Sequence, residues 1–211
     1  MNKFIFGVIA LVVILGGGVV YLARTTRPNV PPSDGTVTAI SAGDWRRGTT
    51  TPQVVLVEYG DFQCPACRAY QPLVNQLMNE FGDRIEMAYR HFPLPQHRNA
   101  KAAAAAAEAA GRQGKFWEMS DMLYEKQDEW SSEANPENRL RGYAAAMNLD
   151  LSQFQKDLND PAIMQKIESD ARSGTTAGVN STPTFFLNGK ALANPPGYPA
   201  FKQAIENALS Q

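Results

Sequence analysis

The feature that most constrains this sequence is a short apolar run leading into the only two cysteines of the chain. The run Val54–Gly60 is largely apolar and β-branched on both faces, as expected of a buried central strand. Cys64 and Cys67 follow it, with two residues between them. A Cys-x-x-Cys pair where a strand passes into a helix is typical of thiol–disulfide exchange. The pattern therefore predicts a redox-active cysteine pair.

Position within the motif predicts that Cys64 is the nucleophile and Cys67 the resolving thiol. Pro65 indicates that a helix begins directly after Cys64, because proline is preferred at the first helical position. Free backbone N–H groups at that helix end stabilise a thiolate. Pro65 and Ala66 form the dipeptide between the two sulfurs. No organic cofactor is expected, since the sulfurs carry both electrons.

A zinc site and a purely structural disulfide are both weaker interpretations of the pair. A structural zinc site needs about four ligands, and the only histidines, His91 and His97, are far from Cys67 in the sequence. A structural disulfide is disfavoured because so small a ring removes little entropy from the unfolded chain. We expect no metal site.

Composition limits the possible classes of protein. A chain of 211 residues, with 44% hydrophobic and 19% charged residues, fits one globular domain with additional segments. The formal net charge of -1 and the absence of a basic run argue against nucleic-acid binding. Two cysteines are too few for a disulfide scaffold, so their redox role is expected to be catalytic.

The N-terminal part of the chain reads as a membrane anchor and a linker. Residues 1–23 form the predicted anchor, since Phe4–Ala23 has no charged residue and gives about 30 Å of helix, enough to cross a bilayer. A cleaved signal peptide is the alternative, but its apolar region runs only about 7–15 residues. Residues 24–53, rich in proline, glycine and threonine, are predicted to be a linker without a core. The pair Arg46-Arg47 within it is expected to be solvated.

The rest of the chain, residues 54–211, alternates between strand and helix patterns. Strands are predicted over 54–60, 85–92, 184–187 and 190–192, and helices over 64–81, 99–112, 116–130, 137–147, 152–159, 161–174 and 198–209. A kink is expected at Pro72, inside the cysteine helix. This order predicts an α/β layer with a helical insertion over about residues 96–178.

Two motifs then carry a family resemblance. Val-Glu-Tyr-Gly-Asp-Phe-Gln-Cys-Pro-Ala-Cys, and Gly178–Gly189 far downstream, resemble the DsbA-like thiol–disulfide oxidoreductases of bacteria, and most closely their membrane-anchored type. The resemblance covers about Asp44 to Ser210. It implies a thioredoxin fold in which Cys64 forms a mixed disulfide with a client protein. Ala66 departs from the strong oxidants of the family, which carry histidine there.

The resemblance also assigns a role to Thr182-Pro183. Only about 5–6% of X–Pro bonds are cis, so the sequence alone would favour a trans proline that starts a strand. The family instead has a cis proline facing the cysteine pair. Main-chain groups beside Pro183 are then expected to pair with an extended client peptide.

Glu58 is a candidate catalytic residue on separate grounds. It shares one face of the predicted strand with Val54 and Leu56, in a segment that is apolar on both faces. Its carboxyl group is therefore expected beneath the sheet near the cysteines, where burial raises its pKa and lets it relay the proton of Cys67. The alternative is a glutamate at the strand end that reaches solvent or pairs with a lysine.

The sequence thus predicts an enzyme that forms disulfides in unfolded or reduced client proteins outside the cytoplasm. A reductase or isomerase using the same site is one alternative, and a tethered chaperone-like peptide binder is another. The resemblance implies a quinone-linked membrane oxidase of DsbB or VKOR type as the partner that reoxidises the pair. We expect a monomer in the bacterial cell membrane, with a single span and an extracytoplasmic domain. Signal cleavage would instead give a secreted or periplasmic protein.

Overall fold

The computed structural model describes residues 40–211. The predicted anchor Phe4–Ala23 and the greater part of the predicted linker lie outside these residues. Within the described part of the chain, no helix has both the length and the apolar character needed to cross a membrane.

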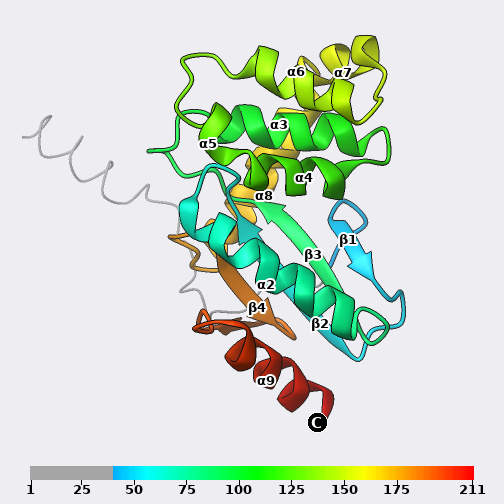
Figure 1. Ribbon diagram of the computed structural model, residues 1–211. Coiled ribbons are helices and arrows are strands. Elements are labelled where there is room, and N and C mark those ends of the chain that lie inside the picture. Colours follow the sequence, from blue (N-terminus) through cyan, green and yellow to red (C-terminus); the bar gives the residue numbers. More distant parts are fainter. Residues whose placement is uncertain (1–39) are drawn as a thin grey trace, which may run out of the picture. The chain divides into compact units, whose positions relative to one another are not determined.

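The described residues form a five-stranded mixed sheet with the order β1-β3-β2-β4-β5 (Figure 1). β2 (Val54–Gly60) and β3 (Ile85–His91) are parallel and central. β1 (Trp45–Gly48), β4 (Thr184–Leu187) and β5 (Lys190–Leu192) each pair antiparallel with a neighbour. The predicted bounds of β2, β4 and β5 are confirmed, and β3 ends one residue earlier than predicted.

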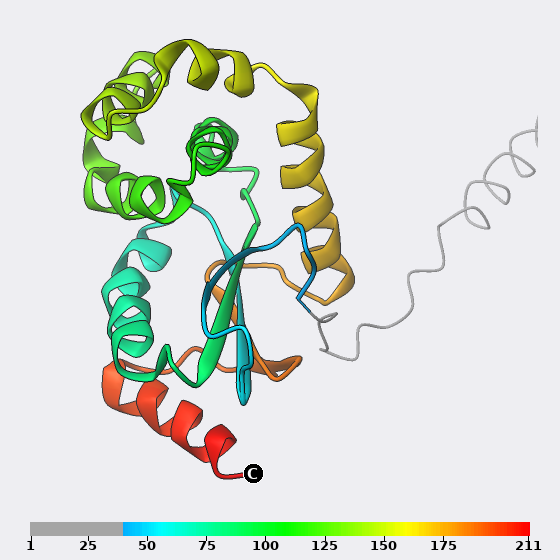
Figure 2. The same ribbon diagram turned by 90° about the vertical axis from the view of Figure 1, so that its right-hand side faces the viewer.

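Helices cover both faces of this sheet. Figure 2 shows α2 (Pro65–Phe81, teal) and α9 (Tyr198–Leu209, red) on one side of the sheet, and α8 (Pro161–Thr176, gold) on the other. Leu56 belongs to the core on the α2 side, and Val57 belongs to the core on the α8 side. Each fully buried side chain of this size contributes roughly 1.5–3 kcal/mol, so the apolar run of β2 holds both layers together.

A block of helices lies between β3 and β4, as the predicted insertion requires. Its members are α3 (Ala100–Gly111), α4 (Phe116–Glu125), α5 (Gln127–Trp130), α6 (Glu137–Ala146), α7 (Leu151–Leu158) and α8. Figure 2 shows α3 end-on, surrounded by the other helices. The alanine run of α3 explains this central place, because small side chains let neighbouring helices approach closely. The single helix predicted over 116–130 is divided at Lys126, whose backbone leaves the helical region at φ -96 and ψ 17.

Residues 24–53 were predicted to be a linker and lead-in without a core, and this is wrong for the last part of the range. β1 pairs with β3, from Trp45 opposite Tyr89 to Gly48 opposite Glu86. The Trp45 ring stacks on Phe116 with 4.5 Å between centroids. Its Nε1 donates a hydrogen bond of 2.7 Å to Glu108 of the helical block. One large aromatic side chain and backbone pairing are enough to fix this edge strand, and average composition does not reveal either.

The pair Arg46-Arg47 was expected to be solvated, and this holds for only one of the two. Arg46 is exposed and forms a 3.2 Å ion pair with Glu86. Arg47 is half-buried, and its guanidinium lies 4.4 Å from the centroid of the Trp117 ring. Consecutive residues of a strand point to opposite faces, so only one member of the pair can face water freely.

Candidate active site

The redox motif occupies the loop that joins β2 to α2. Cys64 is the residue before the first turn of α2, with Pro65 at the start of the helix, as predicted. The backbone N–H of Cys64 donates to the carbonyl of Asp61 at 3.0 Å, and its own carbonyl accepts from Arg68 at 3.1 Å. Pro72 lies inside α2, and the kink expected there stays a prediction. The loop therefore presents Cys64 at the helix N-terminus.

Two polar residues fix this loop, and the sequence did not single out either. Asp61 accepts from the backbone N–H of Gln63 at 2.8 Å, from that of Leu94 at 2.9 Å, and from His97 at 2.7 Å. A short-range signal for Asp61 exists, because aspartate often bonds the backbone two residues further on. Gln127 of α5 has no such signal.

Gln127 connects the helical block to the redox loop. Its buried amide donates to the carbonyl oxygen of Phe62 at 2.7 Å and to that of Cys64 at 3.1 Å. A buried backbone carbonyl without a partner costs roughly 1–3 kcal/mol, so these bonds stabilise the loop conformation. The helical insertion thus contributes directly to the geometry of the site.

The structure holds both cysteines as free thiols and buries them to different degrees. Cys64 is 6% exposed and Cys67 is 1% exposed. Cys64 is therefore buried as well, although it remains the more accessible of the two. The exposed residues of the motif are Pro65 and Ala66, beside it on the first turn of α2.

The two thiols differ strongly in acidity. The pKa of Cys64 is lowered to about 5, mainly by a hydrogen bond from the Cys67 thiol, with help from Thr182 and the first backbone N–H groups of α2, while burial opposes this. Burial raises the pKa of Cys67 well above its usual value, and the neighbouring Cys64 and Glu58 add to this effect. At neutral pH, Cys64 is therefore a thiolate and Cys67 a thiol.

The peptide bond Thr182-Pro183 is cis, as the family resemblance implied. The Cys64 sulfur lies 3.3 Å from the carbonyl oxygen of Thr182 and donates a hydrogen bond to it when it is protonated. The Pro183 carbonyl accepts a 2.8 Å hydrogen bond from Asn194. β4 begins at the next residue, Thr184, and pairs with the end of β2. The structure thus brings together motifs that are far apart in the sequence.

Glu58 lies beneath the redox loop, and its expected burial is confirmed. It is 2% exposed and sits opposite Tyr89 on β3 and Phe185 on β4, which excludes the solvent-exposed alternative. Burial raises its pKa to about 7, while Arg47 acts to lower it and Cys64 to raise it. A carboxyl group that titrates near neutral pH beside Cys67 can accept or return the proton of that thiol. Its role in exchange stays a prediction.

The two histidines each form a hydrogen bond with a carboxylate. His91 is buried and bonds Glu108 at 2.8 Å. His97 bonds Asp61, and so contributes to the redox loop only through that residue.

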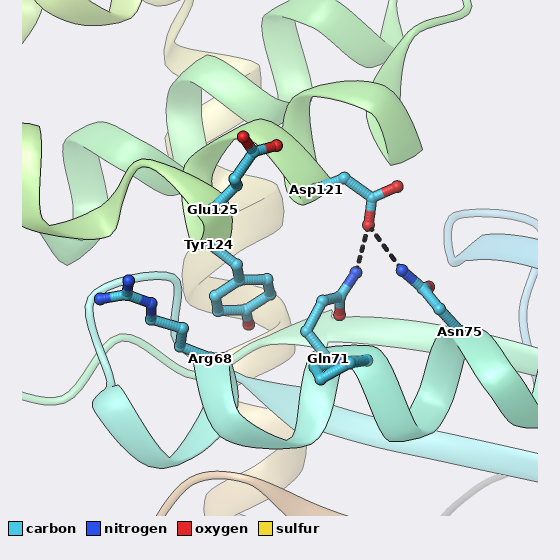
Figure 3. A pocket seen from close by; sticks show the side chains of 7 residues that line it. Arg68, Gln71, Asn75, Asp121, Tyr124 and Glu125 are labelled. Carbon is cyan, nitrogen blue, oxygen red and sulfur yellow. Dashed lines mark hydrogen bonds between the residues drawn. The ribbon is translucent and has the colours of Figure 1, made fainter.

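A hollow lies between α2 and α4, one turn beyond the cysteines (Figure 3). Asp121 of α4 is the centre of its polar contacts, accepting from Asn75 at 3.1 Å and from Gln71. Figure 3 shows the amide groups of both α2 residues pointing toward the Asp121 carboxylate. Tyr124, which also lines the hollow, bonds the hydroxyl of Tyr89 at 3.2 Å. These contacts connect the α2 surface to the helical block.

Comparison with known proteins agrees with this architecture. A family model described as thioredoxin matches residues 41–207. The chain belongs to this thioredoxin family. The DsbA-type fold is shown by solved structures of similar shape. The oxidised BdbD of Bacillus subtilis has a TM-score of 0.73 at 22% identity, over 83% of this chain and 98% of its own. The α-DsbA1 protein of Wolbachia pipientis has a TM-score of 0.72 at 21% identity, over 81% and 93%.

Curated relatives of this thioredoxin-family protein are much longer than the chain itself. A protein of Salinispora arenicola named Na(+)/H(+) antiporter NhaA 1 is 39% identical over 168 residues, which is 79% of this chain and 25% of the relative. The chain thus spans about a quarter of the length of the curated relatives it matches. The family model confirms the thioredoxin family, the solved structures show the DsbA-type fold, and the cysteine geometry fits dithiol–disulfide exchange.

Proposed function

We propose that this protein forms disulfides in client proteins outside the cytoplasm. The acidity of Cys64 supports this direction most strongly. A stabilised thiolate favours the dithiol form, and it therefore makes the disulfide form oxidising. The pKa of about 5 for Cys64 falls between the values of about 7 in thioredoxin and about 3.5 in DsbA. A reductase would need a pair nearer the thioredoxin end.

The geometry supports the following sequence of exchange steps. A client thiolate attacks the Cys64 sulfur of the oxidised pair, the Cys64–Cys67 bond breaks, and Cys67 leaves as a thiolate. Glu58, when protonated, returns a proton to Cys67. A second client thiolate then attacks the client sulfur of the mixed disulfide, which releases the client disulfide and the Cys64 thiolate. Two electrons pass from the client to the cysteine pair.

The client is expected to bind beside Thr182-Pro183. The Thr182 carbonyl oxygen lies 3.3 Å from the Cys64 sulfur, which is the atom that the client must reach. An extended peptide can add to the strand edge at this point through main-chain hydrogen bonds, which suits many sequences. Pro65 and Ala66 complete the surface around Cys64, because both are exposed.

The partner and the location are also part of the proposal. The predicted anchor Phe4–Ala23 would tether the domain to the outer side of the bacterial cell membrane. A quinone-linked membrane oxidase of DsbB or VKOR type would then remove the two electrons from the reduced pair. Carbonate and high-salt washing of membranes tests the anchor, and release of a shortened protein would show signal cleavage instead.

Oxidation of a reduced, unfolded thiol client by the purified disulfide form tests the activity. The wild type is expected to form client disulfides, while Cys64→Ser and Cys67→Ser are both expected to be inactive, because a protein with one cysteine of the pair has no disulfide to transfer. A tethered peptide binder would bind the client equally well in all three proteins without oxidising it. Alkylation of the reduced protein should follow a midpoint near pH 5 at Cys64. Preferential labelling of Cys67 would overturn the nucleophile assignment.

A further inference from the structure

Arg47 of β1 projects from the same face of the sheet as Glu58. β1 pairs Arg47 with Met87 of β3, and β3 pairs Met87 with Leu56 of β2. Paired residues share a face of the sheet, and so do residues two apart on one strand. The side chains of Arg47, Leu56 and Glu58 therefore all lie on the face that α2 covers.

The Arg47 guanidinium is held under α2 by neutral groups. Its Nη1 donates to the side-chain oxygen of Asn75 at 2.8 Å, and its Nη2 lies 3.5 Å from the Met87 sulfur. The Trp117 ring covers the guanidinium. The buried Nε–H donates to no atom of the described residues. None of these contacts is a carboxylate, so the positive charge of the Arg47 guanidinium is not neutralised by them and still acts on more distant groups.

Several titratable and charged groups surround Glu58. They come from β1, β3, α4 and the first turn of α2, and they are Arg47, Tyr89, Tyr124, Cys64 and Cys67. Burial raises the pKa of both tyrosines well above the usual value, so neither carries a charge near neutral pH. The positive charge in this set belongs to Arg47. Asp121 lies on the far side of Arg47, joined to it through Asn75.

We propose that Arg47 is a positioning residue for the resolving step, because its positive charge favours the carboxylate form of Glu58 and so supports transfer of the Cys67 proton to it. This inference rests on the proposed function. In the step, the S–H bond of Cys67 breaks and its proton passes to Glu58. The Cys67 sulfur then forms the bond to Cys64, and the sulfur previously bound to Cys64 leaves as a thiolate with the electron pair.

Reaction of the reduced protein with Ellman's reagent separates this step from the preceding one. Attack by Cys64 releases a first thionitrobenzoate, and the resolving attack by Cys67 releases a second. Stopped-flow absorbance therefore gives one rate for each cysteine across a range of pH. Client oxidation, measured separately in the wild type, tests the proposed function independently of these rates.

Arg47→Met and Arg47→Gln remove the charge, and Arg47→Gln can keep the hydrogen bond to Asn75. In both variants the midpoint of the second phase should move up by about one pH unit, so that this phase slows about tenfold below the midpoint. Arg47→Lys should restore most of the wild-type profile. The matched control Arg46→Met, from the exposed side of the same strand, should leave both phases unchanged.

The double variant tests whether Arg47 acts through Glu58. In a Glu58→Gln background, Arg47→Met should slow the second phase no further. An additive loss in that background, or equal slowing of both phases, would show a merely structural role and overturn the inference. If wild-type protein shows both phases but oxidises no client, the proposed function fails while the role of Arg47 is still decided by these rates.

Discussion

Asp44 and Glu58 are two buried carboxyl groups on opposite sides of one sheet, and the protein treats them differently. On the α8 side, Asp44 pairs with Arg90 through two bonds of 2.9 and 2.8 Å, and Arg90 also bonds the Tyr59 hydroxyl at 3.1 Å. Hydrogen bonds with Arg90 and the Ser41 backbone hold the pKa of Asp44 below its usual value against the effect of burial. On the α2 side, burial dominates, and the pKa of Glu58 rises to about 7.

The difference separates a carboxylate that stays ionised from a carboxyl group that can exchange its proton. A carboxylate fixed by two arginine hydrogen bonds stays ionised over the whole physiological range, so it can only hold the fold together. Glu58 interacts with the charge of Arg47 without a hydrogen bond between them, and it changes protonation near neutral pH. Such a group is suited to proton transfer. The same sheet therefore carries a permanent ion pair on one face and a titrating group beside the sulfurs on the other.

Breaking the ion pair should produce the largest effect. Arg90→Met leaves Asp44 buried without its partner, so we expect a loss of about 3–5 kcal/mol in the free energy of unfolding. Urea denaturation at neutral pH measures it, with the exposed Arg46→Met as a control expected to stay within about 0.5 kcal/mol. If Arg90→Met were as stable as the wild type, the claim that the Asp44–Arg90 ion pair stabilises the fold would be contradicted.

Glu58→Gln, unlike Arg90→Met, should stabilise the protein at neutral and higher pH. The folded protein keeps a proton on Glu58 up to about pH 7, whereas the unfolded chain releases it near the usual value of 4.5. Rising pH through this window therefore destabilises the wild type, by up to about 3 kcal/mol. Glu58→Gln should not lose stability over this pH range, because glutamine does not titrate. Below about pH 4.5 it should be no more stable than the wild type. Urea unfolding of both proteins at pH 4.5 and 8 measures the difference.

The same variant should slow the step that deprotonates Cys67. Glutamine keeps the shape of the side chain but cannot accept a proton. The second phase of the reaction with Ellman's reagent should therefore lose its dependence on the Glu58 titration. Kinetics unchanged between about pH 6 and 8 would make Glu58 a structural residue like Asp44.

A smaller effect is expected at the motif itself. Ala66→His adds a hydrogen-bond donor and a charge beside Cys64 without touching either carboxyl group. The potential of the pair should rise by roughly 30 mV, which is about 1.4 kcal/mol for this two-electron couple, and the pKa of Cys64 should fall. A redox titration in glutathione buffers measures the change, and a lowered potential would contradict it.

Local sequence patterns were sufficient to predict most of the fold and part of the candidate site. The apolar run of β2 and Pro65 indicated the strand and the start of α2. The alternation along β2 placed Glu58 on the same face as Val54 and Leu56, and the structure shows that α2 covers this face. The cis bond before Pro183 required the family resemblance, because its local sequence does not distinguish the isomers.

What could not be predicted depends on contacts between distant segments. β1 is held by backbone pairing and by Trp45, and its composition resembles that of a linker. Gln127 acts on the redox loop from the helical block, at a separation of 63 residues from Cys64. Arg47 lies on the α2 side of the sheet only because β1 pairs with β3. Because the sequence did not predict β1, it also did not predict that the positive charge of Arg47 would act on Glu58.

The reduction potential of the Cys64–Cys67 pair tests the central claim most directly. Equilibration of the purified protein with glutathione buffers, followed by quantification of the dithiol, gives this value. The acidity of Cys64 predicts a potential between the thioredoxin and DsbA values of roughly -270 and -120 mV, nearer the oxidising end. A potential at or below that of thioredoxin would contradict the disulfide-forming role and identify the protein as a reductase.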